Sequence, residues 1–300
     1  MSPTPSAPCD RGAHVPGTVP GEEPATRKRR SHARVLPRVA MLAAVLALTT
    51  GCTQSAWMRL GMPAPVTQQG ARTVSLWQGS WIAALCVGAV VWGLILWAVI
   101  FHRKRGDQPP MQVRYNLPIE MLYTVVPFIM VGVLFFFTAR DENYINKLPA
   151  HPGVVVNVTG YQWSWEFQYP QYKVAGAPGN MVTVNGQPWS PVTGNKGVPV
   201  LVIPDHESVR FNLVSTDVVH SFWVPPFEFK RDVIPGHPNH FQVTPTKTGY
   251  FLGHCTELCG LYHSRMIFYV KIVTPAQFSQ WIHAQQAHQT AQATSAGSVS

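Results

Sequence analysis

LWQGSWIAALCVGAVVWGLILWAVIF, residues 76–101, contains no charged side chain. A helix needs about 20 mostly apolar residues to cross the hydrocarbon core of a bilayer, so this stretch is long enough. Trp77, Trp81 and Trp97 lie towards its two ends, where tryptophan favours the membrane interface. The stretch therefore predicts a transmembrane helix.

A second apolar run, residues 119–138, is uncharged apart from Glu120 near its start. The loop between the two runs is basic, with Arg103, Lys104, Arg105 and Arg114 against Asp107. Basic loops stay on the cytoplasmic side of a membrane. Residues 76–138 therefore predict a helical hairpin, with the chain on both sides of it outside the cytoplasm.

The N-terminal region has the layout of an export signal. Residues 1–26 are rich in Pro, Gly, Ser and Ala, which predicts disorder. A basic cluster from Arg27 to Arg38 and a short apolar run follow, and together they complete a leader of residues 1–51. Two outcomes stay open for Cys52. It becomes the lipidated N-terminus of a lipoprotein, although Thr49 replaces the usual aliphatic residue, or cleavage occurs nearby and Cys52 has no role.

The segment after the hairpin, residues 152–273, contains many short β-rich runs. Residues 52–75, before the hairpin, form a short polar linker. Residues 208–214 alternate as a half-buried strand does, and turn residues separate the runs. This pattern predicts a mainly β fold, a sandwich or barrel. Within it, residues 168–199 predict a long loop or irregular hairpin, and residues 274–300 a polar tail that begins with a short helix.

Charge and cysteine usage exclude some functions. The formal net charge is +9, but the basic residues gather in the leader, and from residue 152 onward eight basic side chains face seven acidic ones. No basic and aromatic surface suited to phosphates is visible, which argues against nucleic acid as a partner. The five cysteines do not form a disulfide framework, because only Cys255 and Cys259 lie in the β-rich outer domain, residues 152–273.

The segment HCTELCGLYHSRM, residues 254–266, carries the chemistry. Its candidate ligands have the spacing Cys-x3-Cys-x3-His-x2-Met: Cys255, Cys259, His263 and Met266, with His220 far upstream. Thiolates, imidazoles and a thioether are soft ligands suited to copper. One cysteine would suit a mononuclear blue-copper site. A second allows two thiolates to bridge two metal ions, each completed by a histidine, with Met266 and a backbone carbonyl as weak outer ligands.

Other interpretations of this segment exist. A Cys-x3-Cys pair alone, on an exported domain, is more often a disulfide or a redox couple. Structural zinc sites place their paired ligands closer together and have no use for a methionine. The alternative function is an exported copper chaperone or thiol–disulfide protein. Such proteins need a thioredoxin-like fold with an early cysteine pair, whereas Cys255 and Cys259 come late, among strands.

From about Leu76 to Val273 the chain closely resembles subunit II of haem–copper cytochrome c oxidases. The resemblance rests on four segments that match in order and spacing, residues 160–165 (GYQWSW), 217–225, 229–236 and 253–266. It implies a cupredoxin-like Greek-key β-barrel or sandwich that holds a dinuclear copper centre, CuA. The implied ligands are His220, Cys255, Glu257 through its backbone carbonyl, Cys259, His263 and Met266.

The same resemblance implies roles and partners. Trp163 is the residue through which electrons enter from cytochrome c, the side chain of Glu257 contacts a magnesium ion shared with subunit I, and Glu120 is the mouth of a proton path. Electrons pass to haem in subunit I, where oxygen becomes water and protons are pumped. The chain itself carries no oxygen chemistry. It is expected in the bacterial plasma membrane with its CuA domain on the outer face, bound to subunit I and other oxidase subunits.

One departure concerns the electron donor. The outer domain has few acidic side chains, so long-range steering of a basic cytochrome c is expected to be weak. The resulting hypothesis is a membrane-tethered or complex-bound cytochrome c held by direct contacts. Quinol-oxidase subunits that have lost the copper ligands do not match, and nitrous oxide reductase lacks the hairpin. The donor's identity, the haem types and the neighbouring subunits stay open.

Overall fold

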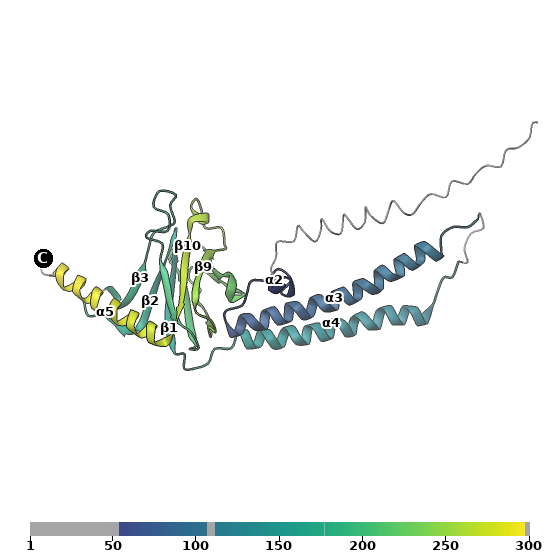
Figure 1. Ribbon diagram of the computed structural model, residues 1–300, viewed down its shortest axis with the longest axis horizontal. Coiled ribbons are helices and arrows are strands. Elements are labelled where there is room, and N and C mark those ends of the chain that lie inside the picture. Colours follow the sequence, from purple (N-terminus) through teal and green to yellow (C-terminus); the bar gives the residue numbers. More distant parts are fainter. Residues whose placement is uncertain (1–53, 107–111, 177, 298–300) are drawn as a thin grey trace, which may run out of the picture. The chain divides into compact units, whose positions relative to one another are not determined.

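The computed structural model describes residues 54–106, 112–176 and 178–297, so the leader and Cys52 lie outside the described residues. A short helix, α2 (Gln54–Met58), precedes two long apolar helices, α3 (Gln68–Phe101) and α4 (Leu117–Ile145), which run side by side (Figure 1). By length and composition both α3 and α4 can cross a membrane. The two apolar helices of the predicted hairpin are therefore present.

Both helices extend beyond the apolar runs that predict them. Helix α3 starts earlier because Thr67 acts as its N-cap, with the hydroxyl accepting a hydrogen bond from Gly70 N at 2.9 Å. Helix α4 continues past residue 138 through a polar turn. There Asp141, only 3% exposed, accepts from Arg140 Nε at 3.0 Å and lies 3.8 Å from Arg72 of α3. Local capping and pairing, rather than hydropathy, set these ends.

The segment before α3 is bonded to the β domain and is not a free linker. Val66 N donates to Pro226 O at 3.0 Å, and Thr246 N donates to Val66 O at 2.7 Å. Val66 is 3% exposed and Gly70 is buried. A Cβ on Gly70 would lie 2.7 Å from the carbonyl oxygen of Phe227, so only glycine allows this close approach.

The outer domain is a sandwich of two five-stranded sheets (Figure 1). Its strands are β1 (Val154–Tyr161), β2 (Ser164–Lys173), β3 (Met181–Asn185), β4 (Val200–Pro204), β5 (Val209–Ser215), β6 (His220–Val224), β7 (Phe229–Val233), β8 (Asn239–Val243), β9 (Gly249–Cys255) and β10 (Ile267–Val273). The sheet orders are β3-β2-β1-β5-β8 and β4-β10-β9-β6-β7. The chain passes repeatedly between the sheets, as in the Greek-key topology of a cupredoxin-like fold.

Aromatic rings fill the space between the sheets. The alternation in β5 buries Val209, Phe211 and Leu213 completely. Phe222 of β6 stacks on Phe268 of β10 with ring centroids 4.7 Å apart. A Cβ on Gly253 would lie 2.3 Å from the Phe268 ring, so glycine is required just before the Cys255 loop. The core thus fixes the strands that carry the candidate ligands.

Two segments can be compared with their sequence-based expectation. Within residues 168–199 the irregular hairpin is the alternative that holds, because the end of β2 pairs antiparallel with β3 and the register shifts between Tyr169 and Lys173. Residues 275–297 form a continuous helix, α5 (Pro275–Gly297), rather than a polar tail with a short helix. Phe278 and Ile282 are buried against the domain, and the Gln289 side chain bonds both N and O of Thr183 on β3. Helix α5 therefore covers a sheet edge, which sequence periodicity did not reveal.

Candidate metal centre

Strand pairing brings the candidate ligands together. His220 is the first residue of β6 and Cys255 is the last of β9, and these two strands are antiparallel neighbours. The loop from β9 to β10 carries Cys259, His263 and Met266, and it is closed by a bond of 3.0 Å from Cys255 N to Met266 O. Residues distant in sequence thus meet at one end of the sandwich.

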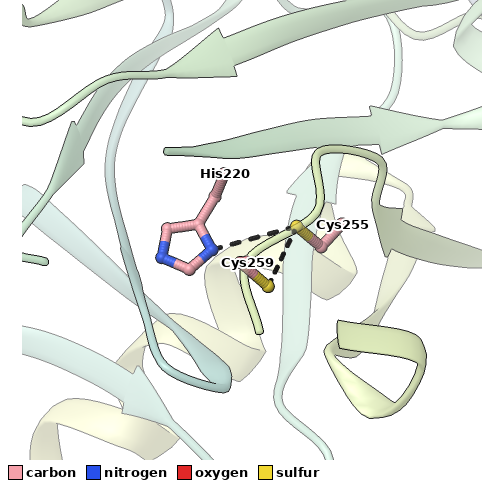
Figure 2. A group of neighbouring side chains, drawn as sticks. All are labelled: His220, Cys255 and Cys259. Atoms are coloured by element: carbon pink, nitrogen blue, oxygen red, sulfur yellow. Dashed lines mark hydrogen bonds between the residues drawn. The ribbon is translucent and has the colours of Figure 1, made fainter. Parts of the chain in front are cut away.

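The two cysteines lie at the centre of the cluster. Their Sγ atoms are 3.8 Å apart, and His220 Nδ1 is 3.8 Å from Cys255 Sγ. Figure 2 shows the imidazole nitrogen directed at Cys255 and the two sulfur atoms facing each other. Both thiols are free and buried. His220, Cys255 and Cys259 together can hold a metal ion, since their ligand atoms all lie within 4.8 Å of one another.

The remaining candidate ligands surround the same sulfurs. His263 Nδ1 is 3.5 Å from Cys259 Sγ, and Met266 Sδ is 3.7 Å from it. The backbone oxygen of Glu257 is 3.2 Å from Cys255 Sγ. Each sulfur therefore has one histidine and one weaker donor beside it, so all six positions expected from the sequence meet at one place.

The electrostatics of the Cys255 and Cys259 thiols favour a bound cation. Burial raises the pKa of both thiols, but at Cys255 the contact with the His220 ring and hydrogen bonds with the backbone outweigh burial and lower the pKa. At Cys259 burial and the charge of the neighbouring Cys255 thiolate raise the pKa to about 12. Two thiolates this close therefore need a positive charge beside them to ionise together.

Asp217 holds the ring of His220 in place. Its Oδ1 lies 2.8 Å from His220 Nε2, and its two oxygens also accept from the backbone N–H groups of Val218 and Gln162, each at 2.6 Å. Burial raises the pKa of this carboxyl, but these hydrogen bonds outweigh burial and lower it. A carboxylate at Nε2 keeps the proton there, which leaves the lone pair of Nδ1 facing Cys255.

The aromatic segment after β1 touches the cluster through Cys259. Trp163 Nε1 donates to Cys259 O at 3.2 Å, and Gln162 Nε2 donates to the same oxygen at 2.7 Å. The Trp163 ring meets the Tyr262 ring edge-on, with centroids 5.0 Å apart. Trp163 is therefore in direct contact with the backbone of a candidate ligand.

Roles were also expected for Glu120, for the side chain of Glu257 and for Cys52. Glu120 is in the first turn of α4, where its Oε1 accepts from Asn116 N at 3.0 Å and so helps to cap the helix. The Glu257 side chain is exposed. The structure therefore does not bring Glu120 to the cluster, and Cys52 lies outside the described residues.

Sequence reasoning assigned no role to Asp217 or Gln162, although both belong to the site's surroundings. A carboxylate three residues before a candidate ligand histidine was a usable signal, because histidines that bind metal usually donate their other N–H to a carboxylate or carbonyl. Gln162 gave no such signal. Its contact with Cys259 joins residues almost a hundred positions apart.

The donor set fits copper. Two thiols, two imidazole nitrogens, a thioether and a carbonyl oxygen converge, and His220, Cys255, Cys259 and Met266 are at most 5% exposed. Soft thiolate and thioether ligands select copper, whereas structural zinc prefers four tetrahedral thiolate or imidazole ligands. Such a set can hold a metal whose charge offsets two thiolates.

Comparisons with known proteins agree with one another. Residues 154–273 match the family model for the cytochrome c oxidase subunit II periplasmic domain. A probable cytochrome c oxidase subunit 2 of Streptomyces avermitilis is 50% identical over 279 residues, covering 84% of this chain and 87% of the relative. The cytochrome c oxidase subunit 2 of Mycobacterium bovis is 36% identical over 294 residues, covering 83% and 81%.

Among solved structures, the periplasmic domain of subunit II of cytochrome oxidase from Bradyrhizobium japonicum is similar to this chain. The match has a TM-score of 0.41 and 26% identity, and it covers 48% of this chain and 99% of that one. The family membership rests on the matches along most of the sequence. The chain belongs to the cytochrome c oxidase subunit II family.

Proposed function

We propose that this chain is the electron-entry subunit of a respiratory terminal oxidase and holds a dinuclear CuA centre. The observation that carries the proposal is the buried pair of free thiols, Cys255 and Cys259, with Sγ atoms 3.8 Å apart and a histidine beside each. The family supports an oxidoreductase complex, within which this chain has no oxygen chemistry of its own. A β-sandwich does not suit the alternative of a thioredoxin-like chaperone.

In this proposal the residues divide the binding work. Cys255 and Cys259 would hold the two ions together with His220 and His263, and Met266 and the Glu257 carbonyl would be weak outer ligands. When bound, the copper pair supplies one-electron redox chemistry shared over two metals. The chain excludes water from it, since His220 and Met266 are fully buried. The closed loop holds the ligands so that little rearrangement accompanies a change of charge.

Trp163 is the proposed entry point for electrons. It is partly exposed and donates a hydrogen bond to the carbonyl of Cys259, which supports a short covalent and hydrogen-bonded route from the surface to a ligand sulfur. The proposed donor is cytochrome c, and the proposed acceptor is haem in subunit I. Oxygen reduction and proton pumping then belong to the assembled oxidase.

The surface near the cluster supports a donor held by direct contacts. Leu258 and Leu261 are 80% and 79% exposed, and both lie on the ligand loop. Apolar exposed residues favour association through close contact rather than through long-range charge steering. The proposed donor is therefore a cytochrome c tethered to the membrane or bound within the complex. Measuring the oxidation of a soluble basic cytochrome c across ionic strength tests this. The proposal expects a slow, weakly salt-dependent rate, and a fast, steeply salt-dependent rate contradicts it.

Two acidic residues have proposed roles towards subunit I. The exposed side chain of Glu257 lies between the bridging cysteines in sequence, and its carboxylate would contact a magnesium ion shared with subunit I. Glu120 would form the mouth of a proton path. Its hydrogen bond to Asn116 N gives it a capping role as well, so a glutamine variant that keeps this bond tests proton uptake separately from helix stability.

The proposed location is the bacterial plasma membrane, with the outer domain on the extracytoplasmic face. The two apolar helices and the periplasmic-domain family match support this arrangement. Lipidation of Cys52 stays a proposal. Mass spectrometry of the mature N-terminus would find a diacylglyceryl modification on Cys52 if the export signal is of the lipoprotein type.

The central test is metal content. The purified full-length chain, loaded with copper in detergent, is expected to bind two copper ions. It is also expected to give a mixed-valence EPR signal in which one unpaired electron couples to both copper nuclei, together with near-infrared absorption. A single copper ion per chain, or zinc retained in preference to copper, would contradict the proposed dinuclear site.

A further inference from the structure

The short segment that precedes the first membrane-spanning helix exposes apolar side chains. Trp57 is 54% exposed, Met58 71% and Leu60 38%. The sequence from residue 54 to residue 66 contains one charged side chain, Arg59. A turn on a water-facing surface usually has polar side chains, so this composition calls for a different environment.

Two hydrogen bonds locate this segment along α3. Trp77 Nε1 donates to Leu60 O at 3.3 Å, and Gln78 Nε2 donates to Met58 O at 2.7 Å. Trp77 and Gln78 stand at the beginning of the uncharged run of residues 76–101. The segment therefore lies beside α3 at the level where that helix would enter the bilayer, next to Trp77 and Trp81, whose rings meet edge-on at 5.7 Å.

Several backbone groups of the segment have hydrogen-bond partners within it or on α3. Leu60 and Gly61 both have positive φ, 52° and 87°, so the chain reverses here and cannot use helical hydrogen bonds. The Met58 and Leu60 carbonyls are bound by the α3 side chains, Met62 N donates to Arg59 O at 3.1 Å, and Arg59 Nε donates to Met62 O at 3.0 Å. Backbone groups near lipid need such partners, because little water is available to them.

Polar groups thus point inward and apolar side chains point outward, which is the arrangement of a membrane-facing element. Tryptophan, methionine and leucine beside a single arginine are residues that settle at the boundary of headgroups and acyl chains. The exposed side chains also continue the apolar surface of α3. From these observations we propose that Trp57, Met58 and Leu60 insert into the outer leaflet of the bilayer as a third, interfacial anchor beside the two spans.

Photocrosslinking in the assembled oxidase tests the proposal. The variant Met58→p-benzoylphenylalanine is irradiated in native membranes and then analysed by mass spectrometry. The expected result is phospholipid adducts on the peptide that contains position 58. The matched control is Val192→p-benzoylphenylalanine, since Val192 is 90% exposed on an outer-domain loop and should give no lipid adduct.

Two results would overturn the anchor. Adducts confined to another oxidase subunit would make the surface a protein interface, and no more lipid adduct than at position 192 would place the segment in water. If the Met58 variant does not assemble, Trp57→p-benzoylphenylalanine replaces one aromatic ring by another at the same surface and gives the same discrimination. The outcome is independent of copper binding, so a failure here leaves the proposed metal centre unaffected.

Discussion

The two histidines beside the cysteine pair are held in different ways. His220 begins a strand, is fully buried, and has Asp217 at its second ring nitrogen. His263 lies in a short turn, η4 (His263–Arg265), and is partly exposed. Among the described residues, no carboxylate forms an ion pair with His263.

This difference extends to what positions each ring. The ring of His220 contacts Trp165 at a centroid distance of 6.1 Å, and a Cβ on Gly160 would come within 3.1 Å of it, so its position is fixed by packing. The His263 ring lies 3.5 Å from Cys259 Sγ, and its backbone bonds Gly260 O and Met266 N within the same loop. In the proposed copper site, packing of the chain would position the His220 side, whereas the His263 side would depend more on the bound metal.

The largest effect is expected from substitution of the two cysteines, which the His220 side and the His263 side of the site share. Cys255→Ser or Cys259→Ser takes away one of the two bridging sulfurs, so each variant should lose the dinuclear site and the oxidation of cytochrome c by the assembled oxidase. Copper quantitation and EPR check this. Cys86→Ser is the matched control, because Cys86 is an exposed thiol on α3 and its loss should change neither quantity. A Cys255→Ser chain that kept two copper ions would contradict the bridging arrangement.

Replacing each histidine by glycine separates the two sides. His263→Gly should regain the copper signal when imidazole is added, because its site is open to solvent. His220→Gly should not, because its cavity is closed, and it should also lose roughly 3 kcal/mol or more of folding stability, as for deletion of a buried ring. Thermal unfolding and EPR with added imidazole measure both effects. Equal rescue of the two variants by imidazole would contradict the proposed difference between how His220 and His263 are held.

Removing the charge beside His220 should have a smaller effect. Asp217→Asn weakens the acceptor that holds the imidazole, and outer partners of this kind typically change metal affinity by about 10- to 100-fold. Competition with a copper chelator measures the affinity. Glu207→Gln, a carboxylate change in the turn between β4 and β5, should leave it unchanged. If Asp217→Asn binds copper as tightly as the unchanged chain, packing alone positions His220.

Asp217 and Gln162 show which parts of the site the sequence analysis missed. The six candidate ligands were recognisable because five of them lie within one short segment, and the β-rich runs were recognisable by their alternation. The contact of Asp217 with His220 follows from a local spacing of three residues that the sequence analysis did not use, whereas the contacts of Gln162 depend on how turns from different strands meet, which no local pattern encodes. A short helix was predicted at the start of α5, but its full length was not, because only its first turns carry buried apolar side chains, Phe278 and Ile282, and its later contact with the sheet comes from the polar Gln289.

The smallest expected effect concerns the residue that joins the two sides. Gln162 donates through its backbone N–H to Asp217 and through its side chain to Cys259 O, so it links the support of His220 to the ligand loop of His263. Gln162→Leu removes only the side-chain bond, which is worth about 1 kcal/mol, and Trp163 Nε1 still donates to the same oxygen.

The informative measurement is therefore a double-mutant cycle. If Gln162 couples the two sides, the effects of Gln162→Leu and Asp217→Asn on copper affinity should depart from additivity by about 0.5 kcal/mol or more, as for residues in one network. Gln162→Leu combined with Glu207→Gln should be additive and serves as the control cycle. Additivity in both cycles would mean that the buried strand histidine and the loop histidine are held independently, and that only the sulfurs connect them.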